Sequence, residues 1–84
     1  MAAGRFRETR KTIENKLSAR ELEVLTAIAH GYSRKAISEK LSISVLTYDG
    51  HRKNIKIKLG LNSQADWASA LVLFRNVRVD TALE

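Results

Sequence analysis

Four serines along the middle of the chain constrain its fold more than any other feature of the sequence. Each serine precedes a segment in which apolar residues recur at the spacing of an α-helix, and serine is a favoured N-cap residue. The four candidate caps are Ser18, Ser33, Ser44 and Ser63. Proline is absent, and few segments show the alternation of polar and apolar residues that indicates a strand. The sequence therefore predicts an all-α protein with four helices.

The first predicted helix has the clearest end signals. Ser18 and Glu21 have the spacing of a capping box, and Gly31 is a residue type that commonly ends a helix. Gly60 gives a similar end to the third helix. After the first, the helices are predicted at 33–41, 44–59 and 63–76.

The length of 84 residues suits one small domain. Residues 1–16 are rich in basic side chains and poor in apolar anchors, so we expect a basic linker or N-terminal arm there. Residues 17–76 are predicted to form the folded domain, and residues 77–84 a C-terminal tail. The linker-like start also favours a domain excised from a longer protein over a free-standing one.

The charge balance points to a polyanionic partner. Fifteen lysines and arginines outnumber nine acidic residues, which gives a formal net charge of +6. There is no cysteine, and His30 and His51 are far apart in the sequence, so we expect no metal site and no cofactor. We expect no enzyme, because a glycine-rich phosphate loop and a paired catalytic histidine are both absent. No apolar run approaches the ~20 residues of a bilayer span, so we expect no membrane association.

The second and third predicted helices are typical of a helix-turn-helix at about residues 35–56. In such a unit the second helix enters the DNA major groove. Here that helix has one apolar side, formed by Tyr48, Ile55 and Leu59. Its opposite side carries Val45, Leu46, Asp49, Lys53 and Lys56, with Arg52 at the flank. A cationic outward side on a helix that is apolar inward predicts binding to double-stranded DNA.

Residues 17–70 also resemble the LuxR/FixJ/NarL/GerE-type DNA-binding domain of bacterial transcriptional regulators. The matching elements are Leu17–Leu25, Gly31–Ser33, Ile37–Leu41, Ile43–Ser44, Thr47, His51–Arg52, Asn54–Ile55 and Lys58–Gly60. This resemblance implies a four-helix helix-turn-helix bundle without a wing, whose third helix contacts DNA and whose fourth helix forms a dimer. It also implies that residues 49 and 53 face bases, and that Thr47, Arg52, Lys56 and the start of the fourth helix face phosphates.

The candidate site residues fall into two sets. The predicted DNA contacts are Ser44, Val45, Leu46, Thr47, Asp49, Arg52, Lys53, Lys56 and Ser63. The predicted dimer contacts, on the fourth helix, are Trp67, Leu71 and Phe74. Val45 and Leu46 have two interpretations, since they could contact thymine methyl groups or pack on the first predicted helix.

Three positions depart from the family pattern: Tyr48 is larger than the usual aliphatic residue, Asp49 brings a negative charge, and Gly50 weakens a helix interior. The helix either continues through Gly50 or starts late, with Asp49 as its cap. Asp49 could accept a hydrogen bond from cytosine N4 and set specificity. Alternatively, it indicates weak DNA affinity or a surface reused for a protein partner.

The leading hypothesis is sequence-specific DNA binding by the effector domain of a bacterial transcriptional regulator. We expect a homodimer in the cytoplasm, associated with the nucleoid, and RNA polymerase is a further candidate partner. The resemblance implies a response-regulator or quorum-sensing effector domain; relatives carry this domain behind a receiver or a small-molecule sensor, and a few are free-standing. The alternatives are a protein-interaction adaptor that has lost DNA affinity, and a promoter-recognition region like that of a sigma factor.

Overall fold

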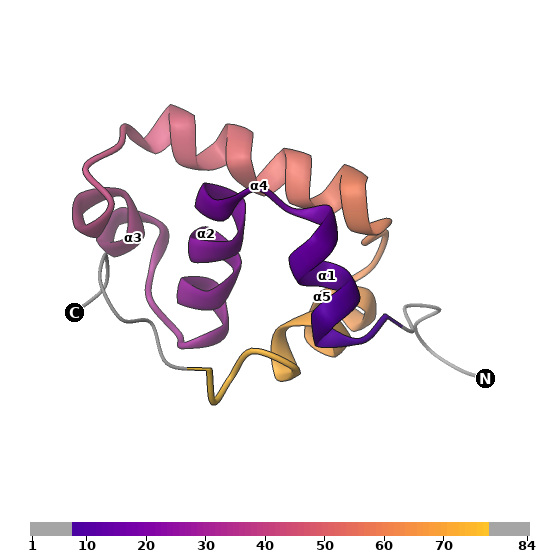
Figure 1. Cartoon of the computed structure of the whole chain (residues 1–84). Coiled ribbons are helices and arrows are strands. Elements are labelled where there is room, and N and C mark those ends of the chain that lie inside the picture. The colour runs from indigo at the N-terminus through magenta and orange to yellow at the C-terminus, as the bar shows by residue number, and fades with distance from the viewer. Residues whose placement is uncertain (1–7, 78–84) are drawn as a thin grey trace.

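The serines predicted to cap helices begin four of the helices in the structure, which confirms this part of the sequence analysis. The hydroxyl of each serine accepts a hydrogen bond from the backbone N–H three residues later, at 3.0–3.1 Å. The structure is a computed structural model that describes residues 8–77. Within that range it contains five helices and no strand (Figure 1). The helices are α1 (Arg10–Lys16), α2 (Ala19–Ala29), α3 (Arg34–Lys40), α4 (Val45–Leu59) and α5 (Gln64–Val72).

Helix α1 corrects the prediction of four helices, because it lies within the segment expected to be a linker or arm. Thr9 caps α1 by accepting a hydrogen bond from the Thr12 N–H at 3.2 Å, and the Ile13 side chain is fully buried. A seven-residue helix with one apolar anchor has no recurring apolar pattern, so its sequence resembles a solvated linker. The rest of the predicted arm and tail, residues 1–7 and 78–84, lies outside the described residues.

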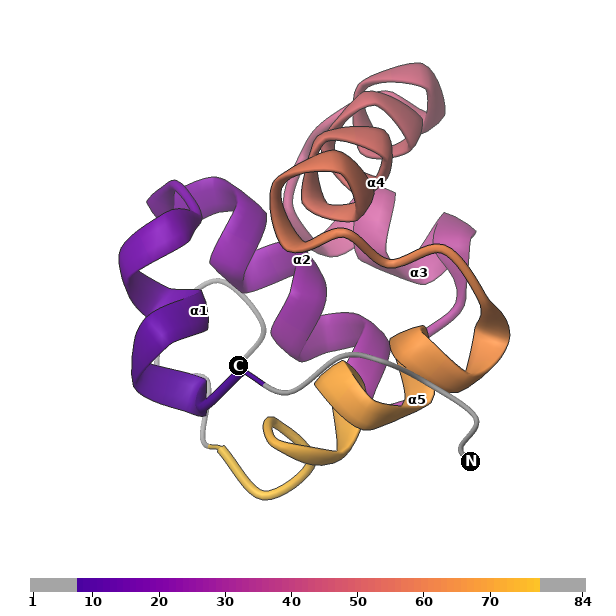
Figure 2. The same cartoon turned by 90° about the vertical axis from the view of Figure 1, so that its right-hand side faces the viewer.

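Helix α2 lies at the centre of the bundle and packs against α3, α4 and α5. Figures 1 and 2 show α4 crossing one side of the molecule, with α3 near its N-terminal end and α1 near its C-terminal end. The core between these helices is apolar. Its largest fully buried side chains are Ile13, Val24, Leu25, Ile37, Ile55, Leu61 and Phe74.

The turn between α3 and α4 contains a strained backbone conformation at Ser42. Its φ is +56°, in the left-handed region where residues other than glycine are uncommon. The Ser42 N–H donates to the Glu39 carbonyl at 3.2 Å, and the Ile43 N–H donates to the Ser38 carbonyl at 2.9 Å. These two bonds form a Schellman motif, which satisfies carbonyls at the end of α3. The unit of α3, turn and α4 is the predicted helix-turn-helix.

A glycine inside α4 does not interrupt this helix. The helix is continuous through Gly50 and is capped by Ser44, so the expected continuity is confirmed and the alternative start at Asp49 is wrong. Its inner side is buried as predicted, through Tyr48, Ile55 and Leu59. Burial of three large side chains offsets the cost of a helical glycine, which is about 1 kcal/mol.

An ion pair holds the C-terminal half of α4 against the start of α2. Glu21 Oε1 accepts hydrogen bonds from Lys58 Nζ at 2.8 Å and from the Ser18 backbone N–H at 2.9 Å. Burial raises the pKa of Glu21, but the hydrogen bonds from Lys58 and Ser18 outweigh burial and lower this pKa below its ordinary value. The residue that completes the capping box of α2 therefore also binds α4.

The end of α5 differs from the prediction. The helix stops at Val72 instead of about Asn76, and residues 73–76 form turns. The Phe74 N–H donates to the Leu71 carbonyl at 3.0 Å, a turn-like spacing of three residues. Phe74 follows the buried Asp66 and Ala70 at spacings of four residues, so its side chain continues the inner side of α5 into the core, where it is 1% exposed.

Candidate nucleic-acid interface

The side of α4 turned away from the core forms one continuous line of exposed residues. Leu46, Gly50, Lys53 and Ile57 follow one another at spacings of three or four residues, so they lie along the same side of the helix. Leu46 is 79% exposed and Ile57 is 66% exposed. We call these four residues the outer face of α4. In a helix-turn-helix, this is the surface that would enter a DNA groove.

The N-terminal end of α4 presents the first predicted DNA contacts. The Thr47 N–H donates to Ser44 Oγ at 3.0 Å, and the two hydroxyl groups are hydrogen-bonded at 2.9 Å. Both residues are exposed. Leu46 is also exposed, whereas Val45 is half-buried. Of these two apolar residues, only Leu46 is fully available to a ligand.

A second line of polar residues flanks the outer face: Asp49, Arg52 and Lys56. The first of them is tied to α3, because Arg34 Nε donates to Asp49 Oδ1 at 2.9 Å and Arg34 Nη2 donates to Oδ2 at 2.8 Å. These hydrogen bonds lower the pKa of Asp49 below its ordinary value, and the positive charges of Arg34 and Arg52 act in the same direction. The carboxylate is therefore ionised at neutral pH.

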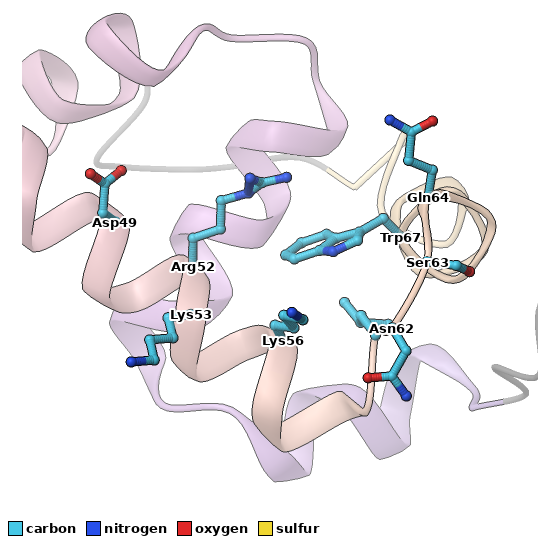
Figure 3. A pocket seen from close by; sticks show the side chains of 9 residues that line it. Asp49, Arg52, Lys53, Lys56, Asn62, Ser63, Gln64 and Trp67 are labelled. Carbon is cyan, nitrogen blue, oxygen red and sulfur yellow. The ribbon is translucent and has the colours of Figure 1, made fainter.

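The second residue of this line connects α4 to α5. The Arg52 guanidinium carbon lies 4.5 Å from the centre of the Trp67 ring, which is a cation–π contact. Figure 3 shows Arg52 pointing toward Trp67 and Lys53 pointing away from it. Arg52 therefore faces the gap between α4 and α5, whereas Lys53 borders this gap but directs its side chain toward the outer face.

A groove of about 510 Å³ separates this part of α4 from the start of α5 (Figure 3). Its lining combines three cations with polar and aromatic side chains. The lining residues are Asp49, Arg52, Lys53, Lys56, Leu61, Asn62, Ser63, Gln64 and Trp67. Since the negative charge of Asp49 is already paired with Arg34, the groove favours an anionic ligand.

The start of α5 adds to this preference for anions. Ser63 caps the helix by accepting a hydrogen bond from the Asp66 N–H at 3.1 Å. The buried Asp66 carboxylate accepts a hydrogen bond from the Asn62 N–H at 3.0 Å, which fixes the loop that leads into α5. The N-terminus of a helix carries a partial positive charge, and here it borders a groove that already contains lysine and arginine.

The structure thus divides the predicted DNA contacts between two neighbouring places. One set lines the groove: Asp49, Arg52, Lys53, Lys56 and Ser63. The other set lies at the N-terminal end of α4: Ser44, Val45, Leu46 and Thr47. The sequence analysis missed Arg34, Asn62 and Gln64. Asn62 and Gln64 are polar and lie beside the Ser63 cap, which was a signal for both. No local pattern connects Arg34 with Asp49, fifteen positions later.

The predicted dimer contacts do not form one surface. The prediction for Phe74 is wrong, because this side chain is in the core. Trp67 is half-buried and contacts Arg52 in the groove. Leu71 is half-buried, and its neighbour Val72, which was not predicted, is 51% exposed.

Within residues 8–77, no three histidine, cysteine, aspartate or glutamate side chains are grouped so that they could hold a metal ion. None of the helices in the same range has the length and apolar character needed to cross a membrane.

A helix-turn-helix whose second helix has an exposed outer face beside a cationic groove defines a class of DNA-binding domains. Residues 15–71 match the family model described as "Bacterial regulatory proteins, luxR family". The chain belongs to this family, so the resemblance stated from its motifs is confirmed. Members of the family are transcription regulators and not enzymes, as predicted, and this chain is a DNA-binding domain of such a regulator.

Individual relatives agree with the family. Fifty residues are 52% identical to the "Oxygen regulatory protein NreC" of Staphylococcus aureus strains JH9, JH1 and Mu3. The match covers 60% of this chain but only 23% of each relative, so the similarity concerns one part of those proteins. No solved structure matches the chain significantly.

Proposed function

We propose that this domain binds double-stranded DNA at specific sequences, as the effector domain of a bacterial transcriptional regulator, with α4 in the major groove. The observation that carries the proposal is the cationic groove directly beside the exposed outer face of α4. One surface of the domain can therefore contact base edges while its neighbour contacts the phosphate backbone.

The outer face and the N-terminal end of α4 supply the base contacts. Leu46, which is exposed and apolar, suits a thymine methyl group, and Lys53 suits guanine O6 and N7. Ser44 and Thr47 lie at the same end of the helix, where their exposed hydroxyl groups suit further DNA contacts. Val45 is half-buried, so it offers less surface to DNA than Leu46 does.

The groove between α4 and α5 supplies the phosphate contacts. Arg52, Lys56 and Ser63 come from two helices and face the same gap. Because Arg52 is held against the Trp67 ring, its position is fixed before DNA binds, so less side-chain entropy is lost on binding.

We also propose a homodimer through α5, with Leu71 and the exposed Val72 in place of the buried Phe74. A dimer of helix-turn-helix domains contacts two half-sites about one helical turn, ~10 bp, apart. The complete regulator would act on the nucleoid in the bacterial cytoplasm, and RNA polymerase at the promoter is its expected protein partner.

Selection from a randomised duplex pool at several salt concentrations tests this function. We expect enrichment of an inverted repeat, together with an affinity that falls steeply as salt rises, because phosphate contacts release counterions. Salt-sensitive binding without enrichment would reduce the proposal to non-specific phosphate binding. Absence of binding to every duplex would overturn it.

A protein-interaction adaptor is the second candidate, and one observation favours it. Leu46 and Ile57 leave two large apolar side chains exposed near opposite ends of the outer face of α4. This candidate predicts no duplex binding at any salt concentration, so the same selection experiment separates it from the first.

A further inference from the structure

The ion pair between Arg34 and Asp49 joins the first residue of α3 to the outward side of α4. Its two hydrogen bonds, at 2.9 and 2.8 Å, use both carboxylate oxygens and fix the plane of the carboxylate. Both side chains remain accessible, Arg34 to 58% and Asp49 to 42%. The pair is therefore well ordered and also open to a ligand.

Stability alone does not account for this arrangement. Exposed ion pairs contribute little to the free energy of unfolding. Other interactions already stabilise the helix-turn-helix. The Schellman motif ends α3 and fixes the turn, and the ion pair between Lys58 and Glu21 connects α4 to α2. The pair between Arg34 and Asp49 is thus not required to keep the two helices together.

Electrostatics explains why an aspartate on this surface needs a partner. A lone carboxylate beside the groove would be repelled by DNA phosphates. The ion pair of a carboxylate and a guanidinium has no net charge, so this repulsion is largely removed. The hydrogen bonds from Arg34 lower the pKa of Asp49, so the group stays an acceptor only. Each carboxylate oxygen uses one lone pair for Arg34 and keeps acceptor capacity for another donor.

We propose that Arg34 is a positioning residue for sequence recognition: it holds the Asp49 carboxylate so that the carboxylate accepts a hydrogen bond from the N4 amino group of cytosine. This inference rests on the proposed DNA binding and adds one base pair to its specificity. Cytosine is the base whose major-groove edge offers a donor without a neighbouring acceptor, which suits a carboxylate.

The test measures base preference at each position of the selected site for wild type, Arg34→Ala, Arg34→Lys and Asp49→Asn. We expect wild type to prefer cytosine at one position by about tenfold. Arg34→Ala should lose most of this preference. Arg34→Lys keeps the charge but not the planar fork, so it should restore overall affinity without restoring the preference. Asp49→Asn should change the preferred base at that position to adenine, which an amide recognises.

Arg20→Ala is the matched control, because Arg20 forms a comparable exposed ion pair with Glu23, at 3.0 Å, on α2. It removes the same charge and should leave every base preference intact. Thermal unfolding of each variant verifies that it is folded.

Two results would overturn the inference while leaving DNA binding established. One is a wild-type site without a cytosine preference, and the other is a preference that Arg34→Ala leaves unchanged. Failure of wild type to bind any duplex would instead remove the proposed function itself.

Discussion

The two sides of α4 are built from the same helix but obey different constraints. The inner side places Tyr48, Ile55 and Leu59 in the core, and each of these is at most 5% exposed. The outer face combines a leucine, a glycine, a lysine and an isoleucine that are all exposed. Packing determines the inner side, so its residue types follow from the fold. The outer face has no such requirement within the described residues, so its residue types carry information about a ligand.

Two isoleucines give the most direct way to test this contrast. Ile55 is fully buried and Ile57, two residues later, is mostly exposed. Ile55→Ala should lower the free energy of unfolding by about 2–5 kcal/mol, because it leaves a cavity in the core. Ile57→Ala should change it by no more than ~0.5 kcal/mol. Urea denaturation measures the free energy of unfolding of both variants. Equal losses would show that packing does not distinguish the inner side of α4 from its outer face.

Two lysines test the division within the outward surface. Lys53→Ala should cost about 1–3 kcal/mol of binding free energy, chiefly at one base position. Lys56→Ala should weaken binding to all duplexes alike and reduce the salt slope by about one unit. Titrations with the selected site and with a scrambled duplex, at several salt concentrations, distinguish the two effects. Lys40→Ala is a suitable control, since Lys40 lies over the Tyr32 ring and is not among the residues that line the groove. A loss at Lys53 that is the same for both duplexes would remove its role in base recognition.

The inner side was largely predictable from the sequence, because local signals determine it. Serine caps and the recurrence of Tyr48, Ile55 and Leu59 need only neighbouring residues to be recognised. Contacts between distant residues were not predictable in this way: Arg34 with Asp49 and Arg52 with Trp67 depend on how the helices meet.

Two errors have a similar physical origin. Helix α1 has one buried anchor, Ile13, which gives no periodic pattern, and its stability depends on packing against the rest of the fold. Phe74 was assigned to a surface together with Trp67 and Leu71, but it also lies four residues after the buried Ala70, and packing places it in the core. Both errors therefore concern side chains whose burial is decided by tertiary contacts and not by the local sequence pattern.

The ion pair between Glu21 and Lys58, in the C-terminal half of α4, predicts that the stability of the domain depends on pH. Glu21→Gln retains an acceptor for the capping box but loses the charge that pairs with Lys58. At neutral pH we expect a loss of about 1 kcal/mol, a modest value because Lys58 is partly exposed. The pKa of Glu21 is lowered in the folded state, so its stabilisation is present above the unfolded carboxyl value and is lost as the pH falls through the folded value. Denaturation of wild type and variant between pH 7 and acid should show the difference shrinking, and a constant difference would contradict the role of charge.

Gly50 gives the smallest and most discriminating test of the contrast, because stability and binding should change in opposite directions there. Apart from its chain neighbours and the nearby backbone of α4, an added Cβ would meet no atom within 4 Å, so Gly50→Ala should raise the free energy of unfolding by about 0.5–1 kcal/mol. On the outer face the same methyl group would stand between Leu46 and Lys53, where it would keep the helix backbone away from the base edges. We therefore expect a more stable protein that binds the selected site more weakly, measured by thermal unfolding and by duplex titration. Greater stability with unchanged affinity would mean that α4 does not approach the bases closely at this glycine.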